Sequence, residues 1–162
     1  MPDPIAYHVS WTCYGQWLHG DVRGFVDRRH HTPGEPYPYN VPQWVADAAN
    51  RMSETPCWLT EAERRIADHA IREACAFREW CLHALNVQPD HVHAVVGAGA
   101  CPGADVRTRL KDRATRALKA AGTQGRTHWW TDGGKVEVLV DERRLHEAIE
   151  YVNHRQPHPK VG

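Results

Sequence analysis

The sequence predicts an α+β fold of the ferredoxin-like (RRM-like) kind, a split βαβ sandwich whose four-stranded antiparallel sheet carries helices on one face. Stretches with strand-type alternation and stretches with helical spacing follow one another in the order β-α-β-β-α-β-α. The second and third strands are joined by the short turn Pro89-Asp90, which is typical of a hairpin. A C-terminal helix carrying Tyr151 completes the fold, and we expect residues 1–162 to form a single domain with one core.

The first strand is predicted over residues 6–14, where Tyr7, Val9 and Trp11 alternate with polar neighbours. The next stretch, Gly15–Asn40, has no period of either kind, and a short helix is predicted at Pro42–Met52. We interpret residues of about 15–58 as a long irregular insertion, a kind of loop that is often functional. Its His30-His31 pair is interpreted as a solvent-exposed loop pair, with a metal or phosphate contact as the alternative.

The central part of the chain contains the clearest helix signal. Thr60 and Glu63 have the spacing of a capping box, and apolar residues recur at helical spacing behind them, which predicts a helix over about 60–80. A strand is predicted at Leu82–Val87, and it leads through the Pro89-Asp90 turn into a strand that begins at His91.

The last part of the chain continues the alternation. A helix is predicted at Ala104–Ala121, ending at Gly122, and a strand at Lys135–Val140 follows a glycine-rich loop. Asp141 is placed to cap a final helix that runs through Val152 and ends before Pro157.

Composition restricts the functional classes. Lys plus Arg and Asp plus Glu both total 20, so the whole protein has no field that attracts polyanions. The segment from Arg107 to Arg126 is nevertheless basic, which indicates either an anion-binding surface or a solvated helix face. Five Cys without a C-x-x-C motif argue for a reducing compartment and against a Cys-rich zinc site. With no apolar run of membrane length, we expect a cytoplasmic protein.

The main functional candidate is the pair His91 and His93. On a strand these side chains point to one face of the sheet while Val92 and Ala94 point to the other. Two neutral imidazoles at this spacing can hold one metal ion, although a His-x-His triplet arises about once by chance in a chain with 12 His. The first strand lies beside the third in this strand order, which brings His8 near the pair; we interpret His8 as a core or sheet-edge histidine.

The sequence Pro89-Asp90-His91-Val92-His93 resembles the His-hydrophobic-His motif of the single-tyrosine HUH transposases, and most closely that of the REP-associated tyrosine transposases. The resemblance continues elsewhere in the chain, leaving only residues of about 20–58 poorly matched. It includes Tyr7-His8-Val9-Ser10-Trp11-Thr12, Arg109-Leu110-Lys111, Trp130-Thr131-Asp132-Gly133-Gly134 and Ala148-Ile149-Glu150-Tyr151-Val152.

This resemblance implies a chemistry. A metal ion, Mg²⁺ or Mn²⁺, held by His91 and His93 polarises a phosphodiester, and Tyr151 attacks it to form a 5′-phosphotyrosine. The reverse reaction joins strands. The family takes a third ligand from an amide about one turn after the tyrosine, where this chain has Arg155, which cannot bind a cation. Gln156 is therefore the expected third ligand, with His154 as the alternative.

The resemblance also implies a partner, single-stranded or hairpin DNA from palindromic repeat elements, bound by a monomer or a homodimer. Phosphate contacts are expected from the basic helix, and an unpaired base is expected to stack on one of two indoles while the other packs in the core. The expected DNA-binding residues are Arg109, Lys111, Arg113, Arg116, Trp129 and Trp130.

Other functions fit less well. A non-catalytic nucleic-acid-binding descendant of the same family is the main alternative, and Arg155 favours it. A His-triad phosphoesterase needs a histidine where Val95 stands. A two-histidine phosphoesterase needs two His-x-Ser/Thr repeats, of which this chain has only His8-Val9-Ser10.

Overall fold

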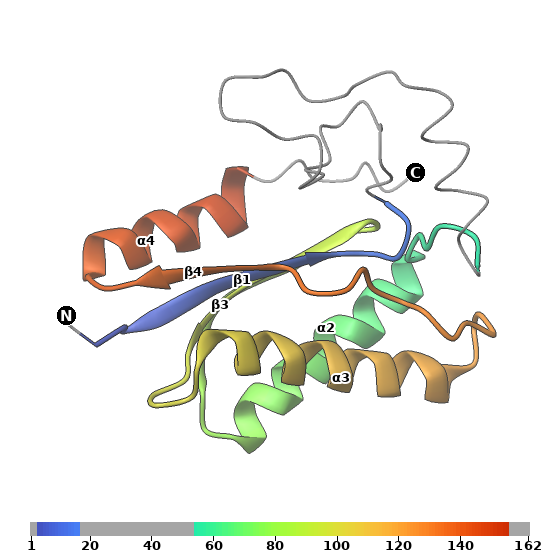
Figure 1. Ribbon diagram of the computed structural model, residues 1–162, viewed down its shortest axis with the longest axis horizontal. Helices are drawn as coiled ribbons and strands as arrows, with labels where there is room; N and C mark the ends of the chain where they lie inside the picture. Colours follow the sequence, from blue (N-terminus) through green and yellow to red (C-terminus); the bar gives the residue numbers. More distant parts are fainter. Residues whose placement is uncertain (1–2, 17–53, 156–162) are drawn as a thin grey trace.

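A computed structural model describes residues 3–16 and 54–155, and Figure 1 shows how its elements are arranged. In chain order these are β1 (Ala6–Thr12), α2 (Glu61–Phe77), β2 (Cys81–Val87), β3 (His91–Gly97), α3 (Gly103–Ala121), β4 (Lys135–Leu139), α4 (Glu142–Glu150) and the π-helical turn η1 (Tyr151–Arg155). The strands form one antiparallel sheet of four in the order β2-β3-β1-β4. This is the strand order of the split βαβ sandwich, and the predicted fold class is confirmed.

The helix ends follow from local side-chain chemistry. At the start of α2 the Glu63 amide donates to Thr60 Oγ1 at 3.2 Å while the Thr60 amide donates to the Glu63 carboxylate at 2.9 Å, which is the predicted capping box. Helix α3 ends at Gly122, whose φ of 67° is in the left-handed region. Asp141 accepts a hydrogen bond from the Arg144 amide at 2.8 Å and caps α4 as predicted.

The two faces of the sheet are covered differently. Helices α2 and α3 lie side by side across one face (Figure 1), where Ile71 and Leu110 pack with Val9 and Trp11 in the main core. On the opposite face, α4 and η1 cover only part of the sheet, where Ala148 and Val152 pack in a smaller apolar cluster with strand residues such as Val95. Among the described residues, this second face leaves room for a pocket beside α4 and η1.

The insertion is described only at its ends. The Cys57 amide donates to the Tyr14 carbonyl at 2.8 Å, and the Tyr14 amide donates to the Trp129 carbonyl at 2.9 Å. The two ends of the insertion therefore pair with each other, and the first end also pairs with the loop before β4. The predicted helix Pro42–Met52 and the His30-His31 pair lie outside the described residues. Across residues 3–16 and 54–155, no helix combines the length and apolar character needed to span a membrane.

Candidate active site

The histidine pair lies on the partly covered face of the sheet, as its alternation predicted. His91 and His93 on β3 are partly exposed, while Val92, Ala94 and Val96 are buried in the core between the sheet and the helices α2 and α3. The two rings are edge-on to each other with centroids 5.0 Å apart. His91 Nδ1 lies 2.7 Å from the Asp90 carboxylate, so the turn residue that precedes the motif orients its first imidazole.

A third histidine joins this pair. His8 on β1 has its Nε2 atom 2.9 Å from Nδ1 of His93, with ring centroids 5.1 Å apart. The expectation that His8 lies near the pair is confirmed. Its side chain is mostly buried, but β1 is an inner strand, so the interpretation of His8 as a sheet-edge residue is wrong. The pairing of Ser10 with His93 in the β1–β3 ladder puts His8 diagonally across from His93 on the same face, within reach of a ring-to-ring hydrogen bond.

Tyr151 reaches the same place from the start of η1, directly after α4. Its neighbours Ala148 and Val152 are buried against the sheet, and the side-chain amide of Asn86 on β2 donates to the Val152 carbonyl at 3.1 Å. Tyr151 itself is 41% exposed. Its ring centroid lies 5.8 Å from that of His8 and 5.9 Å from that of His93. Residues about 140 positions apart in sequence are thus brought together on one face.

These side chains line a pocket of about 410 Å³ between β1, β3, β4 and α4. Both cationic and acidic groups border it, and sequence reasoning did not include them in the site. The lining residues are His8, Ser10, His93, Lys135, Glu137, Arg144, Glu147, Ala148 and Tyr151. Lys135 and Glu137 are two positions apart on β4, which lies beside β1, so their side chains point to the same face as His8. The strand period and the strand order together could have predicted this.

The imidazoles of the pocket are held in their neutral form. Burial, followed by the nearby His91, His8 and Lys135, lowers the pKa of His93 to about 3. Burial also lowers the pKa of His8, against an opposing effect of Glu137. A neutral imidazole is the form that can accept a hydrogen bond or bind a metal ion.

This shift makes stability depend on pH. Between pH 6.5 and pH 3 the unfolded chain binds a proton at His93 that the folded chain does not, so the free energy of unfolding should fall as the pH falls through this range. For His93 alone we expect a loss of about 2 kcal/mol between pH 7 and pH 5. Urea unfolding at both pH values should show a smaller loss in His93→Gln. An equal loss of unfolding free energy in His93→Gln and in the wild type would contradict the lowered pKa of His93.

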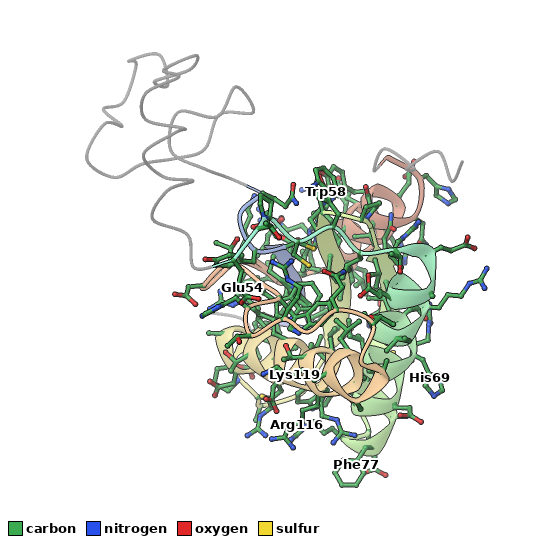
Figure 2. All side chains as sticks on the ribbon, turned by 90° about the vertical axis from the view of Figure 1, so that its right-hand side faces the viewer. Glu54, Trp58, His69, Phe77, Arg116 and Lys119 are labelled. Carbon is green, nitrogen blue, oxygen red and sulfur yellow. The ribbon has the colours of Figure 1, made fainter. Side chains whose placement is uncertain are left out.

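The basic residues of α3 lie on the other side of the molecule. This helix packs on the face opposite the histidines, and Figure 2 shows Arg116 and Lys119 on its outer surface. Arg109 and Arg113 are exposed, and Arg116 pairs with Asp112 at 3.1 Å. Lys111 donates to the carbonyls of Thr131 and Gly133 at 2.8 Å each, so it anchors the loop before β4. The basic residues of α3 and the histidine pair do not form one surface.

The expected base-stacking indoles are buried. Trp129 is 1% exposed and Trp130 is 9% exposed, and both belong to the main core. The Trp130 indole donates to Thr115 Oγ1 at 2.8 Å and packs edge-on against Trp11 with centroids 5.8 Å apart. The expectation that one of these rings stacks on a base is therefore wrong, because neither presents a face to solvent.

The third metal ligand is not placed by the structure. Gln156 lies outside the described residues, and His154 is exposed at the end of η1. Within residues 3–16 and 54–155, no group of three or more His, Cys, Asp or Glu side chains is arranged to hold a metal ion. Residues Tyr151–Arg155 form a π-helix, whose turn is wider than that of an α-helix. The residue one turn after Tyr151 therefore differs from the one that α-helical spacing indicates.

Comparison with known proteins supports the fold. The chain is similar to a REP-associated tyrosine transposase bound to a REP hairpin, with a TM-score of 0.54 and 12% sequence identity over 94% of this chain. It spans 66% of the length of that protein. A "putative transposase" from Deinococcus radiodurans R1 aligns with a TM-score of 0.47 and 19% identity over 92% of this chain and 88% of its own. No family model and no curated protein matches the sequence. At these identities the likeness concerns the fold.

Proposed function

We propose that this protein is a transposase-like, metal-dependent endonuclease and strand transferase that acts on single-stranded DNA at hairpin-type elements. The observation that carries the proposal is the convergence of Tyr151 with His8 and His93 in one pocket, with ring centroids within 6 Å. Nothing in packing requires a partly exposed tyrosine to lie over neutral histidines, whereas phosphodiester transfer needs a nucleophile beside a group that binds the phosphate.

Tyr151 is the nucleophile in this proposal. Its hydroxyl oxygen attacks the phosphorus of the scissile phosphodiester, the bond from phosphorus to the 3′ oxygen breaks, and that oxygen leaves with a proton as a free 3′ hydroxyl. The phenol proton is released to solvent. The strand is retained as a 5′-phosphotyrosine, and attack by a 3′ hydroxyl on this ester joins strands without any other energy source. Burial of Ala148 and Val152 on either side of Tyr151 holds its backbone in place.

The histidines fit a divalent cation. His91 and His93 present two imidazoles on one face, and the lowered pKa of His93 keeps its ring in the ligating form. We propose that these two residues bind Mg²⁺ or Mn²⁺ together with Gln156. When bound, the cation neutralises charge on the phosphate oxygens and makes the phosphorus more electrophilic.

Lys135 is proposed to contact the phosphate backbone. It lines the pocket with His93 and Tyr151, whereas Arg113 is exposed on the helix that covers the opposite face. Lys135→Ala should weaken binding of single-stranded DNA about threefold to tenfold and reduce its salt dependence. Arg113→Ala, which removes the same charge, should change binding less. Fluorescence anisotropy at two salt concentrations measures both. A larger loss of binding in Arg113→Ala would place the DNA on the α3 face. Phosphate contacts by Arg109 and Arg116 on that face stay a prediction.

The proposal is tested with a labelled DNA hairpin that carries single-stranded flanks, the hairpin being suggested by the DNA in the similar structure. With Mg²⁺ or Mn²⁺ the protein should cut one flank at one position and bind the hairpin more tightly than blunt duplex of the same length. Addition of EDTA should stop cleavage. Equal affinity for duplex and hairpin, or cleavage that continues in EDTA, would contradict the proposal.

A non-catalytic DNA-binding role is the second candidate. Arg155 stands at the position where the resembled family has a ligating amide, and an arginine there supplies no ligand. Under this reading the pocket binds DNA through Lys135 and Arg144 without cutting it. Hairpin binding that is unaffected by divalent cations, with no cleavage product, would favour this function over the first.

A further inference from the structure

Three side chains form a line that leads away from the proposed metal site. Nδ1 of His93 lies 2.9 Å from Nε2 of His8, and Nδ1 of His8 lies 3.7 Å from a carboxylate oxygen of Glu137. The His8 side chain is only 11% exposed, while that of Glu137 is 51% exposed. The line therefore runs along the wall of the pocket, from His93 through a mostly buried ring to a half-exposed carboxylate.

We propose that His8 is a positioning residue for His93, and that Glu137 in turn orients His8. This inference rests on the proposed function, because it gives His8 its role through a metal ligand. His8 would accept a hydrogen bond from His93 Nδ1 and so hold the second imidazole of the pair in one orientation and one tautomer.

The hydrogen-bond geometry allows one consistent assignment of protons. A neutral imidazole carries one N–H, and a contact between two ring nitrogens needs one donor and one acceptor. If His93 donates from Nδ1, its lone pair is on Nε2, which is the nitrogen left to bind a cation. His8 then accepts at Nε2 and carries its own proton on Nδ1, on the side of the Glu137 carboxylate. The acidic end of the line favours this direction over the reverse one.

The position of His8 also argues for this role. His93 extends from β3, which lies between β2 and β1. Opposite it on β2 stands Asn86, whose side-chain amide donates to the Val152 carbonyl, whereas His8 on β1 lies 2.9 Å from His93 Nδ1. His91 receives a comparable contact from Asp90, whose carboxylate is 2.7 Å from His91 Nδ1. Each imidazole of the pair is thus engaged through Nδ1, and partners of this kind typically change metal affinity 10-fold to 100-fold when removed.

The first test measures Mn²⁺ binding to the full chain by titration calorimetry in the absence of DNA. His8→Ala should weaken Mn²⁺ binding 10-fold to 100-fold, and His8→Gln, whose amide oxygen can accept from His93 Nδ1, should recover most of the loss. His69→Ala removes an exposed histidine from α2, far from the line, and should bind Mn²⁺ as the wild type does. Glu137→Gln should give an intermediate loss.

The second readout needs no metal. In the metal-free protein, nitrogen-15 NMR of the imidazoles should show His93 with its proton on Nδ1, and His8→Ala should convert it to a mixture of both tautomers. Mn²⁺ affinity within twofold of wild type in His8→Ala, or an unchanged His93 tautomer, would overturn the positioning role. If both His8→Ala and His93→Ala bind Mn²⁺ as the wild type does, the metal site of the proposed function is wrong as well as the positioning role. If only His93→Ala loses Mn²⁺, the proposed function survives and this inference alone is wrong.

Discussion

Replacement of Tyr151 with phenylalanine is expected to abolish the covalent protein–DNA adduct and to reduce cleavage about a thousandfold or more. The phenol is the group that attacks phosphorus, and a phenyl ring has no oxygen to do so. The side chain is 41% exposed above the histidines, so loss of its hydroxyl should change the free energy of unfolding by less than about 0.5 kcal/mol. Metal and DNA binding should be retained.

Denaturing electrophoresis of the protein after incubation with labelled hairpin DNA detects the adduct. Tyr14→Phe is the matched control, because Tyr14 stacks on His128 at a centroid distance of 5.2 Å and does not line the pocket. It should form the adduct at the wild-type rate. An adduct that persists in Tyr151→Phe, or cleavage by the wild type without any adduct, would show that the nucleophile is another group.

Removal of either imidazole of the pair is expected to have the second-largest effect. His91→Ala and His93→Ala should each lower Mn²⁺-dependent cleavage at least about a hundredfold, because one remaining histidine holds the cation too weakly to polarise the phosphate. Both rings lie on the face opposite the main core, so the fold should tolerate their loss at neutral pH. Cleavage rates measured over a Mn²⁺ titration separate weaker binding from slower chemistry.

His69→Ala serves as the control for this pair, since it removes an exposed histidine that contacts Glu73 on α2. Its cleavage rate should equal that of the wild type. Urea unfolding of each variant is measured in parallel. If either His91→Ala or His93→Ala loses several kcal/mol of stability, that histidine is structural, and the loss of cleavage does not report on a metal site.

Most element boundaries could be predicted because their signals are local. Thr60 with Glu63, Gly122 and Asp141 each satisfy backbone groups within a few residues, so the sequence contains both partners of every contact. Helix α2 nevertheless ends at Phe77, earlier than predicted, where Glu79 takes a left-handed φ of 58° and turns the chain into β2. The alternation of His91-Val92-His93 likewise predicted the correct face, because successive strand side chains always point to opposite sides.

Which residues form the site depends on contacts between segments that are far apart in the sequence. A basic helix is compatible with either face of a sheet, and only the packing of Val106 and Leu110 on the Trp11 side shows that α3 lies opposite the histidines. The sequence is equally compatible with the adjacent indoles of Trp129 and Trp130 lying on a binding surface or in a core. The two side chains are only 1% and 9% exposed, which excludes base stacking by either ring.

The sequence by itself determined the order of the elements, their caps and the face on which the histidine pair lies, since periodicity and capping act over a few residues. Only the tertiary structure decided that His8, Lys135 and Tyr151 share a pocket with His93, while Arg113 and Trp129 do not. The physical reason is that neighbours across a sheet are selected by strand register and by which face each helix buries, and both depend on the apolar contacts of the whole chain.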